Sequence, residues 1–274
     1  KAFQVIRDVI RSKDILFPTR RWKIVLVDWE KYDLYREKDF NGKKVPCGLG
    51  PFLENMSKLK GNKNVSITMV INAAMGCDPK LRSKYHKLVE RTGLNVEVFF
   101  RENVARDIGA YDFGYKKALE SNYEGDIAFM NSSVSGPFTD YWLNAFRKLH
   151  YSKENIGLTG TTLNMFPLIE DGKEIGCHKE HVQSWFLYSN MAVLKKAFGN
   201  SLLFQGADYK EKQALIENGE IGISQRVLDK GFGINCMSFP ELSYFKGQTW
   251  PYPFRLGWRI NNAELQKFIN TTIV

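Results

Sequence analysis

The sequence predicts an α/β fold in which a mostly parallel central sheet is flanked by helices. Short, almost continuously apolar runs alternate with segments of helical spacing through the first two-thirds of the chain. Continuous apolar runs are typical of strands that are covered on both faces. The segments between these runs are long enough to form helices, which are the usual connections between parallel strands.

Each element of this pattern has its own signal in the sequence. The clearest helix starts at Pro79, which suits a first turn, and ends at Gly93, which suits a helix end. The apolar runs predict strands at residues 23–29, 65–73, 95–100 and 126–131. Helical spacing predicts helices at residues 3–12, 52–60, 79–93, 107–122 and 138–150.

The last third of the chain is less regular. The pattern there predicts a strand, two helices and a strand, at residues 181–190, 191–199, 220–232 and 233–239. Residues 243–262 combine aromatics with Pro and Gly, which predicts an ordered but irregular flap. The sequence has no internal repeat and no convincing linker, so we expect a single domain over residues 1–274.

Polar residues stand where the predicted strands end. In open parallel sheets, ligands bind beyond the carboxyl ends of the strands. Asn131 is followed there by Ser132 and Ser133, so that small polar side chains close a buried strand. The residues at the strand ends are Asp28, Asn72, Arg101 and Asn131. The sequence therefore predicts a ligand site at this edge of the sheet.

Composition and charge exclude several classes of protein. Hydrophobic residues make up 43% and charged residues 25% of the 274, which is ordinary globular usage. The apolar runs are far shorter than the roughly 18 residues of a membrane span, although an upstream anchor stays open because the sequence begins at Lys1. The net charge of +9 fits either a solvated lysine-rich surface or phosphate-bearing ligands. Because the cations are scattered, we expect no nucleic-acid groove.

The cysteine pattern predicts a reducing compartment. The intervals between the cysteines are irregular and contain no C-x-x-C pair, which argues against a disulfide framework. The sequence CHKEH brings His178 and His181 close to a cysteine, but zinc is disfavoured because no second ligand pair follows at a suitable interval. His181 is open to a structural role or to one in binding. The four cysteines are Cys47, Cys77, Cys177 and Cys236.

The segment RENVARDIGAYDFGYKKALESNYEGDIAFMNSSVSGP, residues 101–137, resembles a recurring stretch of nucleotide-sugar glycosyltransferases with the GT-A fold. The resemblance implies that Arg106 and Asp107 hold the donor at a helix N-terminus, where free N–H groups and a fixed cation suit phosphate or sugar oxygens. The alternative is that Asp107 only caps the helix. The matching positions are Asn103, Arg106, Asp107, Ala118, Gly125 and Asp126.

In that family, a DxD motif at this strand end holds a divalent ion against the donor diphosphate. Here Asn131, Ser132 and Ser133 occupy the position without a carboxylate, and neutral oxygens bind Mn²⁺ or Mg²⁺ weakly. Two alternatives stay open. Lys and Arg side chains neutralise the diphosphate without a metal, or phosphates and water hold the ion. In both, the small polar side chains contact the donor, and no metal ligand is assigned.

A second stretch, NGEIGISQRVLDKGFGIN at residues 218–235, resembles the later acidic motif of inverting members of the group. The resemblance implies that Glu220 opens a helix and is the general base on the acceptor hydroxyl. Asp208 and Glu217 are the back-up candidates, and His181 is a further catalytic candidate. The alternative is that Glu220 only favours the helix dipole.

The closer likeness is to rhamnan-synthesis-F-like glycosyltransferases and to glycan glycosyltransferases of large algal viruses, the chloroviruses. It depends on RDIGAYDFGY, FMNSSVSGPF and HVQSWFLYSN, with GLTGTTLN expected to form a strand at residues 157–164. This likeness implies that the acceptor binds near Gln183, Trp185 and Trp250. The aromatic rings either stack on the acceptor sugars or pack in the core. Asp28 would contact the ribose or base of the nucleotide.

These resemblances predict a hexosyl- or pentosyltransferase that moves a sugar, with inversion, from a nucleoside diphosphate sugar to a glycan hydroxyl. A UDP-sugar is favoured, with a pentose or deoxyhexose such as xylose. Residues 20–135 would bind the donor and residues 136–274 the acceptor. The expected location is the cytoplasm, or the host cytoplasm if the source is viral. The partners would be the donor and a glycan or glycoprotein. The alternative is a catalytically silent nucleotide-sugar or glycan-binding module.

Overall fold

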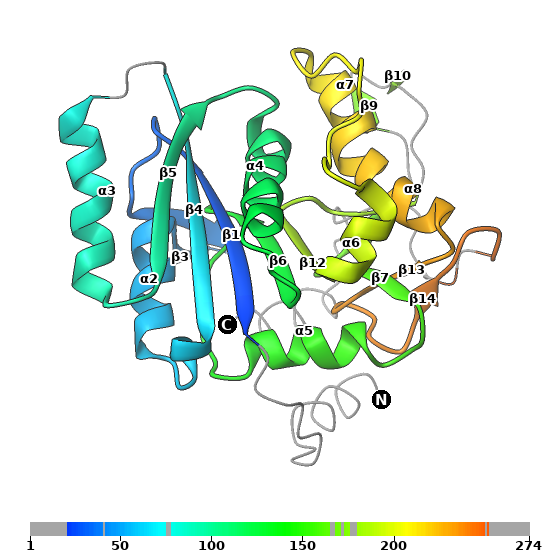
Figure 1. Cartoon of the computed structure of the whole chain (residues 1–274), viewed down its shortest axis with the longest axis horizontal. Coiled ribbons are helices and arrows are strands. Elements are labelled where there is room, and N and C mark those ends of the chain that lie inside the picture. Colours follow the sequence, from blue (N-terminus) through cyan, green and yellow to red (C-terminus); the bar gives the residue numbers. More distant parts are fainter. Residues whose placement is uncertain are drawn as a thin grey trace.

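A computed structural model describes residues 21–40, 42–74, 78–164, 168–170, 173–175, 180–249 and 251 (Figure 1). The predicted helix at residues 3–12 lies outside this part of the chain. Within it, the central sheet has eight strands in the order β14-β13-β7-β12-β6-β1-β4-β5. The sheet is mostly parallel and is flanked by helices, which confirms the predicted fold class.

The first half of the sheet follows the prediction closely. Strands β1, β4, β5 and β6 are parallel neighbours. Their bounds are Trp22–Trp29, Val65–Ala73, Val96–Glu102 and Asp126–Asn131. The connecting helices α2, α3 and α4 are Leu49–Lys58, Pro79–Thr92 and Arg106–Glu120. Asp78 caps α3 by accepting the Lys80 amide at 2.9 Å, and Gly93 ends it in the left-handed conformation.

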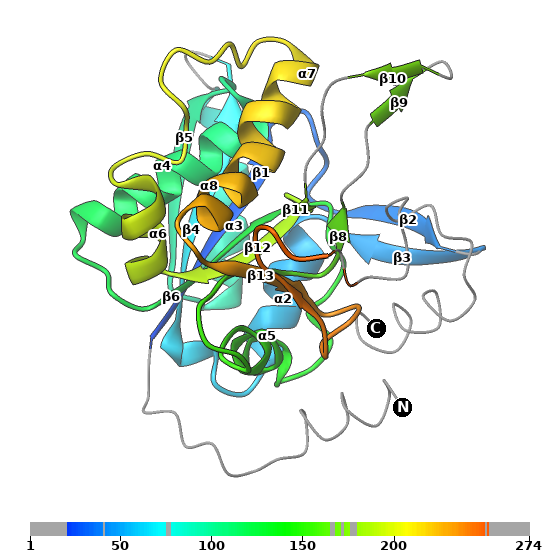
Figure 2. The same cartoon turned by 90° about the vertical axis from the view of Figure 1, so that its right-hand side faces the viewer.

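The alternation of side chains along β1 divides the core into two layers. Ile24 and Leu26 pack in one buried cluster with residues of α2, α3 and α5 (Trp142–His150). Val25 and Val27 pack in another with residues of α4, α6 (Met191–Phe198) and α8 (Gly222–Asp229). Figure 2 shows α4, α6 and α8 on one side of the sheet and α2 on the other. Both faces are therefore covered, as the apolar character of the strand required.

The second half of the sheet differs from the prediction. The expected strand at 181–190 is two strands, β11 (His181–Val182) and β12 (Phe186–Asn190). β12 is antiparallel to both β6 and β7 (Ile156–Gly160), whereas β13 (Gly233–Cys236) is parallel to β7. The expected strand at 157–164 is also divided, because β8 (Leu163–Asn164) leaves the sheet and pairs with β11.

Other bounds also shift. The helix expected at 138–150 begins four residues later, as α5 (Trp142–His150). The preceding residues form a turn in which Asp140 accepts the Lys60 amide at 2.8 Å. Helix α6 is Met191–Phe198, capped by the Asn190 side chain, which accepts the Val193 amide at 3.0 Å. Most of the expected flap lies outside the described residues, but β14 (Ser243–Tyr244) adds an edge strand.

Two small antiparallel ribbons have no counterpart in the prediction. One is the hairpin of β2 (Arg36–Phe40) and β3 (Lys43–Cys47), and the other pairs β9 (Leu168–Glu170) with β10 (Lys173–Ile175). Figure 2 shows both ribbons extending away from the central sheet. A short 3₁₀ turn, Asn62–Asn64, precedes β4. In the part of the chain that the structure describes, no helix has the length and apolar character that a membrane span requires.

Candidate functional site

The strand ends meet at one edge of the sheet, as predicted. In the parallel register, Asn131 lies opposite Val27, and Asn72 lies opposite both Trp29 and Arg101. The tip that follows β6 folds back onto β1, because the Ser132 amide donates to the Val27 carbonyl at 2.8 Å. The residues that end the strands therefore lie together at one edge of the sheet.

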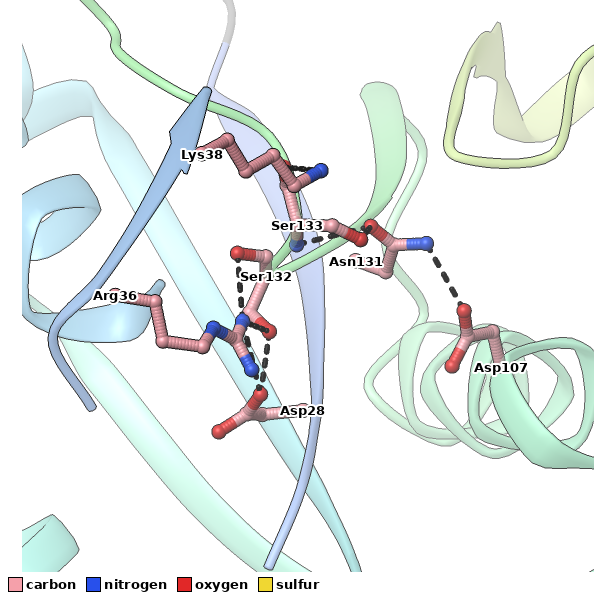
Figure 3. Close-up of polar contacts among 7 residues, drawn as sticks. All are labelled: Asp28, Arg36, Lys38, Asp107, Asn131, Ser132 and Ser133. Carbon is pink, nitrogen blue, oxygen red and sulfur yellow. Dashed lines mark hydrogen bonds and ion pairs between the residues drawn. The ribbon is translucent and has the colours of Figure 1, made fainter. Parts of the chain in front are cut away.

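The tip formed by residues 131–133 is fixed by its own hydrogen bonds. The Asn131 Oδ1 accepts the Ser133 amide at 3.0 Å and the Ser133 hydroxyl at 2.7 Å. The Asn131 Nδ2 donates to Oδ2 of Asp107 at 2.9 Å. Figure 3 shows the tip between Arg36 and Lys38 on one side and Asp107 on the other. Asn131 thus joins the tip to the start of α4.

Asp28 lies under the tip and is 3% exposed. Its Oδ1 accepts the Ser132 hydroxyl and lies 3.8 Å from Nη2 of Arg36, whereas its Oδ2 has no hydrogen-bond partner among the described residues. Burial raises the pKa of the Asp28 carboxyl from its ordinary value of 3.8 to about 6, although Ser132 and Arg36 lower it. An unpaired, buried carboxylate oxygen at a strand end is typical of a binding site rather than of a stabilising contact.

The start of α4 is held in place from β4 and β5. Ala105 and Arg106 have positive φ angles of 57° and 44°. The Asn72 side chain donates to the Arg106 carbonyl at 3.1 Å, and Arg101 donates to Asn72 Oδ1 at 2.6 Å and to the Val104 carbonyl at 2.7 Å. Asn72 and Arg101, both predicted to bind the donor, are thus engaged within the fold and position the turn, whereas the Arg106 side chain is exposed.

This turn leaves no room for a side chain at Gly109. A Cβ atom there would lie 2.1 Å from the Val104 carbonyl oxygen. We therefore expect Gly109→Ala to displace the turn, to lower the free energy of unfolding by about 1–3 kcal/mol and to weaken ligand binding at Asp107. Urea unfolding of the variant measures the first effect. An unchanged unfolding midpoint would show that the turn adapts without cost.

Glu220 contacts two residues of the 181–185 segment. Its Oε2 accepts the Ser184 hydroxyl, and its Oε1 lies 3.4 Å from Nε2 of His181. Burial raises the pKa of the Glu220 carboxyl, but the contacts with His181 and Ser184 outweigh burial and bring it below the ordinary value. Glu220 is therefore ionised at neutral pH.

The prediction that Glu220 opens a helix is wrong. It lies in a π-helical segment, Ile216–Ile221, between α7 (Lys212–Leu215) and α8 (Gly222–Asp229). The three segments follow one another without a break, so Glu220 is far from a free helix N-terminus. A π-helical turn inside a helix is frequent at functional sites. The π-helical turn, rather than the helix dipole, therefore accounts for the orientation of Glu220.

Glu220 and Asp107 are linked through the tip, because Asn131 donates to Asp107 from its side chain and to the Trp185 carbonyl from its amide, next to the Ser184 that donates to Glu220. Burial raises the pKa of the Asp107 carboxyl, and the negative charge of Glu220 raises it further, against the lowering effects of Asn131 and Arg106. Tyr111 is fully buried, and burial together with the negative charges of Asp107 and Glu220 raises the pKa of its hydroxyl well above the ordinary value. Its hydroxyl donates to the Ser184 carbonyl at 2.9 Å.

The other predicted residues have more varied positions. The Trp185 carbonyl accepts the Asn131 amide at 3.4 Å, which brings the 183–185 segment to the tip. Asn103 is exposed. Asp208 is also exposed and accepts the Lys210 amide at 2.8 Å, so it has only a local contact, whereas Glu217 accepts a hydrogen bond from Gln213 at 2.7 Å. Trp250, Cys77 and Cys177 lie outside the described residues, and Cys47 and Cys236 are free, buried thiols.

Four residues at the site were missed by the sequence analysis. Arg36 and Lys38 belong to a hairpin whose charged sequence gave no strand signal, and their contacts with the tip span more than ninety positions of the chain. Tyr111 and Ser184 lie within the motifs RDIGAYDFGY and HVQSWFLYSN. A motif in the sequence does not show which side chains face each other in the fold.

Surface hollows are found at two other sets of residues. One, of about 230 Å³, lies at the opposite edge, where Trp22 and Val65 begin β1 and β4, and Asp140 also lines it. The other, of about 550 Å³, lies between Leu34 and a row of cations on α3. None of the predicted site residues lines either hollow.

Metal ligands of the kind that a DxD motif supplies are not present at the tip. Asn131 Oδ1 and the Ser132 hydroxyl are already hydrogen bonded, and the Arg36 guanidinium lies 2.7 Å from that hydroxyl oxygen. Among the described residues, no group of three or more His, Cys, Asp or Glu side chains is arranged to hold a metal ion. The residues at the tip do not fit a divalent ion, which prefers several charged oxygen ligands.

Comparison with solved structures identifies the fold. A mannosyltransferase from Pyrobaculum calidifontis, in complex with GDP-Man and Mn²⁺, superposes with a TM-score of 0.51 at 8% sequence identity, covering 85% of this chain and 60% of that chain. This likeness shows the fold alone, and it agrees with the predicted GT-A-like α/β fold.

Two other solved structures are less similar. A cytidylyltransferase from Leptospira borgpetersenii has a TM-score of 0.35 at 16% identity, covering 65% of this chain and 63% of that chain. A 4-diphosphocytidyl-2C-methyl-D-erythritol synthase has a TM-score of 0.43 at 11% identity, covering 91% and 99%. No family model matches the sequence, and no curated protein matches it.

Proposed function

We propose that this protein is a glycosyltransferase that uses a nucleoside diphosphate sugar. The observation that carries the proposal is the hydrogen-bonded link between two carboxylates at the carboxyl edge of the sheet. Asp107 accepts the Asn131 side chain, the Asn131 amide donates to the Trp185 carbonyl, and the adjacent Ser184 hydroxyl donates to Glu220. The fold alone leaves the chemistry open. The carboxylates supply it, because one can orient a sugar and the other can take a proton.

In the proposed reaction, the acceptor hydroxyl attacks the anomeric carbon of the donor sugar. The O–H bond breaks and its proton passes to Glu220, which is ionised at neutral pH. The new C–O bond forms as the bond from the anomeric carbon to the diphosphate breaks, and the nucleoside diphosphate leaves. A single displacement of this kind inverts the anomeric configuration. Ser184 and His181 orient the base through their contacts with its two oxygens.

The binding roles follow from the positions of the remaining residues. Asp107 and the exposed Arg106 would bind the donor sugar and phosphate at the start of α4, and Asp28 the ribose or base. Gln183 and Trp185 lie between His181 and the tip, where an acceptor would approach. A UDP-sugar with a pentose or deoxyhexose such as xylose is the favoured donor, and a glycan or glycoprotein is the favoured acceptor.

The buried thiols Cys47 and Cys236 support a cytoplasmic location. The proposal of a viral origin depends on the likeness to the chlorovirus enzymes.

Incubation with a panel of UDP- and GDP-sugars tests the proposal. We expect the protein to release a nucleoside diphosphate slowly by donor hydrolysis and faster when a glycan acceptor is present. NMR of the product should show an inverted anomeric configuration. Failure of every donor to bind would contradict the proposal.

A silent binding module is the second candidate, because Asn131, Ser132 and Ser133 lack the carboxylates of a DxD motif. This candidate predicts tight binding of a nucleotide sugar with no release of nucleoside diphosphate on any acceptor. The same donor panel therefore distinguishes it from the enzyme.

A further inference from the structure

The hairpin β2–β3 brings two cations to the tip that replaces the DxD motif. Arg36 Nη2 donates to the Ser132 hydroxyl at 2.7 Å and to the Ser132 carbonyl at 3.0 Å. Lys38 Nζ donates to the Ser133 carbonyl at 2.6 Å. Arg36 and Lys38 are two positions apart on one strand, so both side chains leave the same face of the hairpin. Figure 3 shows both reaching the same turn.

We propose that Arg36 and Lys38 bind the diphosphate of the donor and supply the positive charge that a divalent ion would otherwise supply. The inference rests on the proposed function and deepens it by assigning the diphosphate-binding residues. The pair matches a diphosphate diester, in which each phosphate carries a single negative charge. Guanidinium and ammonium groups are the usual protein partners of phosphate oxygens.

Both cations can bind phosphate without giving up their present contacts. The contacts of Arg36 with the tip all use Nη2, so that Nε and Nη1 have no hydrogen-bond partner among the described residues. Its side chain is 20% exposed, and its guanidinium carbon lies 4.3 Å from the centre of the Tyr32 ring, which holds its orientation. Lys38 is exposed and uses one of its three N–H donors.

The hairpin is held against the tip by the backbone as well as by these side chains. The Gly48 amide, just after β3, donates to the Ser132 carbonyl at 3.0 Å. Gly48 has a φ of 103°, and a Cβ atom there would lie 2.6 Å from the Leu34 carbonyl oxygen. The positive φ and the contact with Leu34 therefore require glycine at the position whose amide holds the tip. Arg36 and Lys38 are thus presented by a fixed strand rather than by a free loop.

The cations also explain why the tip is neutral. A divalent ion needs charged oxygens at the Asn131 to Ser133 position, and it would be repelled by the Arg36 guanidinium beside Ser132. Small hydroxyl and amide groups instead hold Arg36 and Lys38 in place, and these two cations bind the diphosphate. The tip therefore lacks carboxylates because the cations of the hairpin take the place of the divalent ion that carboxylates would bind.

Calorimetric titration of the full chain with UDP, GDP and the matching nucleosides, in EDTA and in Mn²⁺, tests the inference. We expect the nucleoside diphosphate to bind in EDTA, and Arg36→Gln and Lys38→Gln each to weaken this binding roughly tenfold or more. Nucleoside binding should stay unchanged in Lys38→Gln, because Lys38 contacts the tip and not Asp28. In Arg36→Gln it should fall less than nucleoside diphosphate binding, because that variant loses only the ion pair with Asp28 on the nucleoside side. Arg36→Lys should recover part of the affinity. Lys43→Gln is the matched control, since it removes the same charge from β3, where the exposed Lys43 does not contact the tip.

Three results would overturn the inference, and they are distinguishable. Binding that requires Mn²⁺ and is unaffected in both hairpin variants would refute the hairpin's role and leave the proposed function standing. Absence of nucleoside diphosphate binding under every condition would refute the proposed function and the inference with it. Equal weakening of nucleoside and nucleoside diphosphate binding would show that the hairpin only maintains the fold, and would also overturn the inference.

Discussion

Replacing Glu220 with glutamine should lower the rate of sugar transfer by roughly 10²–10⁴-fold, because the amide cannot take the proton of the acceptor hydroxyl. Glutamine keeps an oxygen that can accept the Ser184 hydroxyl, so the local structure should persist. We expect the loss to fall on kcat, with the KM for the donor little changed, since Glu220 acts on the acceptor. Steady-state assays of nucleoside diphosphate release measure both constants.

Glu217→Gln is the matched control for this substitution. Glu217 lies in the same π-helical segment and is hydrogen bonded to Gln213 at 2.7 Å, so the change removes an equal charge from the same segment. Its activity should stay within a few-fold of the unmodified protein. Full activity in Glu220→Gln, or an equal loss in both variants, would remove Glu220 from the role of base.

The parallel half of the fold could be predicted because its signals are local. Buried parallel strands are apolar along most of their length, and residues 23–29, 65–73 and 126–131 show this pattern. The ends of such strands share an edge, so Asp28, Asn72 and Asn131 could be grouped before their distances were known. Capping and glycine signals at 79–93 gave the helix bounds for the same reason.

The antiparallel half and the hairpin could not be predicted because their contacts are distant in sequence. The 181–190 stretch reads as one strand, but residues 183–185 leave the sheet to meet the Asn131 tip, and nothing in their sequence marks the break. The β2 sequence REKDF is nearly all charged and lacks alternation, so its pairing with β3 is visible only in the structure. The roles of Arg36 and Lys38 depend on that pairing.

The site residues divide in a similar way. Asp107 and Glu220 were found through resemblance, and the structure brings them together, although Glu220 lies in a π-helical turn rather than at a helix start. Arg101 and Asn72 were expected to touch the donor because of their positions, but their side chains are used to hold the α4 turn. A residue's place at the end of a predicted strand thus indicates that it lies at the ligand edge, but it does not indicate whether its side chain binds the ligand.

Replacing Asp28 with asparagine should stabilise the protein at pH 7.5 by up to about 3 kcal/mol, the free energy that corresponds to raising a carboxyl pKa from 3.8 to about 6. Between about pH 4 and pH 6 the folded state keeps a proton on Asp28 that the unfolded state has released. The contribution of this group to stability therefore falls as the pH rises through this range, and the full cost is present above it. Asparagine carries no charge to bury, so the variant escapes the cost.

Guanidinium unfolding at pH 7.5 and near pH 4 measures this effect. The gain should be largest at pH 7.5 and should be small near pH 4, where Asp28 is neutral in the folded state and partly protonated in the unfolded one. Asp33→Asn is the control, because Asp33 follows the same strand but is exposed, and no gain is expected there. We also expect Asp28→Asn to bind the nucleotide more weakly than the unmodified protein. A variant that is no more stable at pH 7.5 would show that the fold bears no cost for this carboxylate, whereas a stable variant with weakened binding would show that the cost is retained for the ligand.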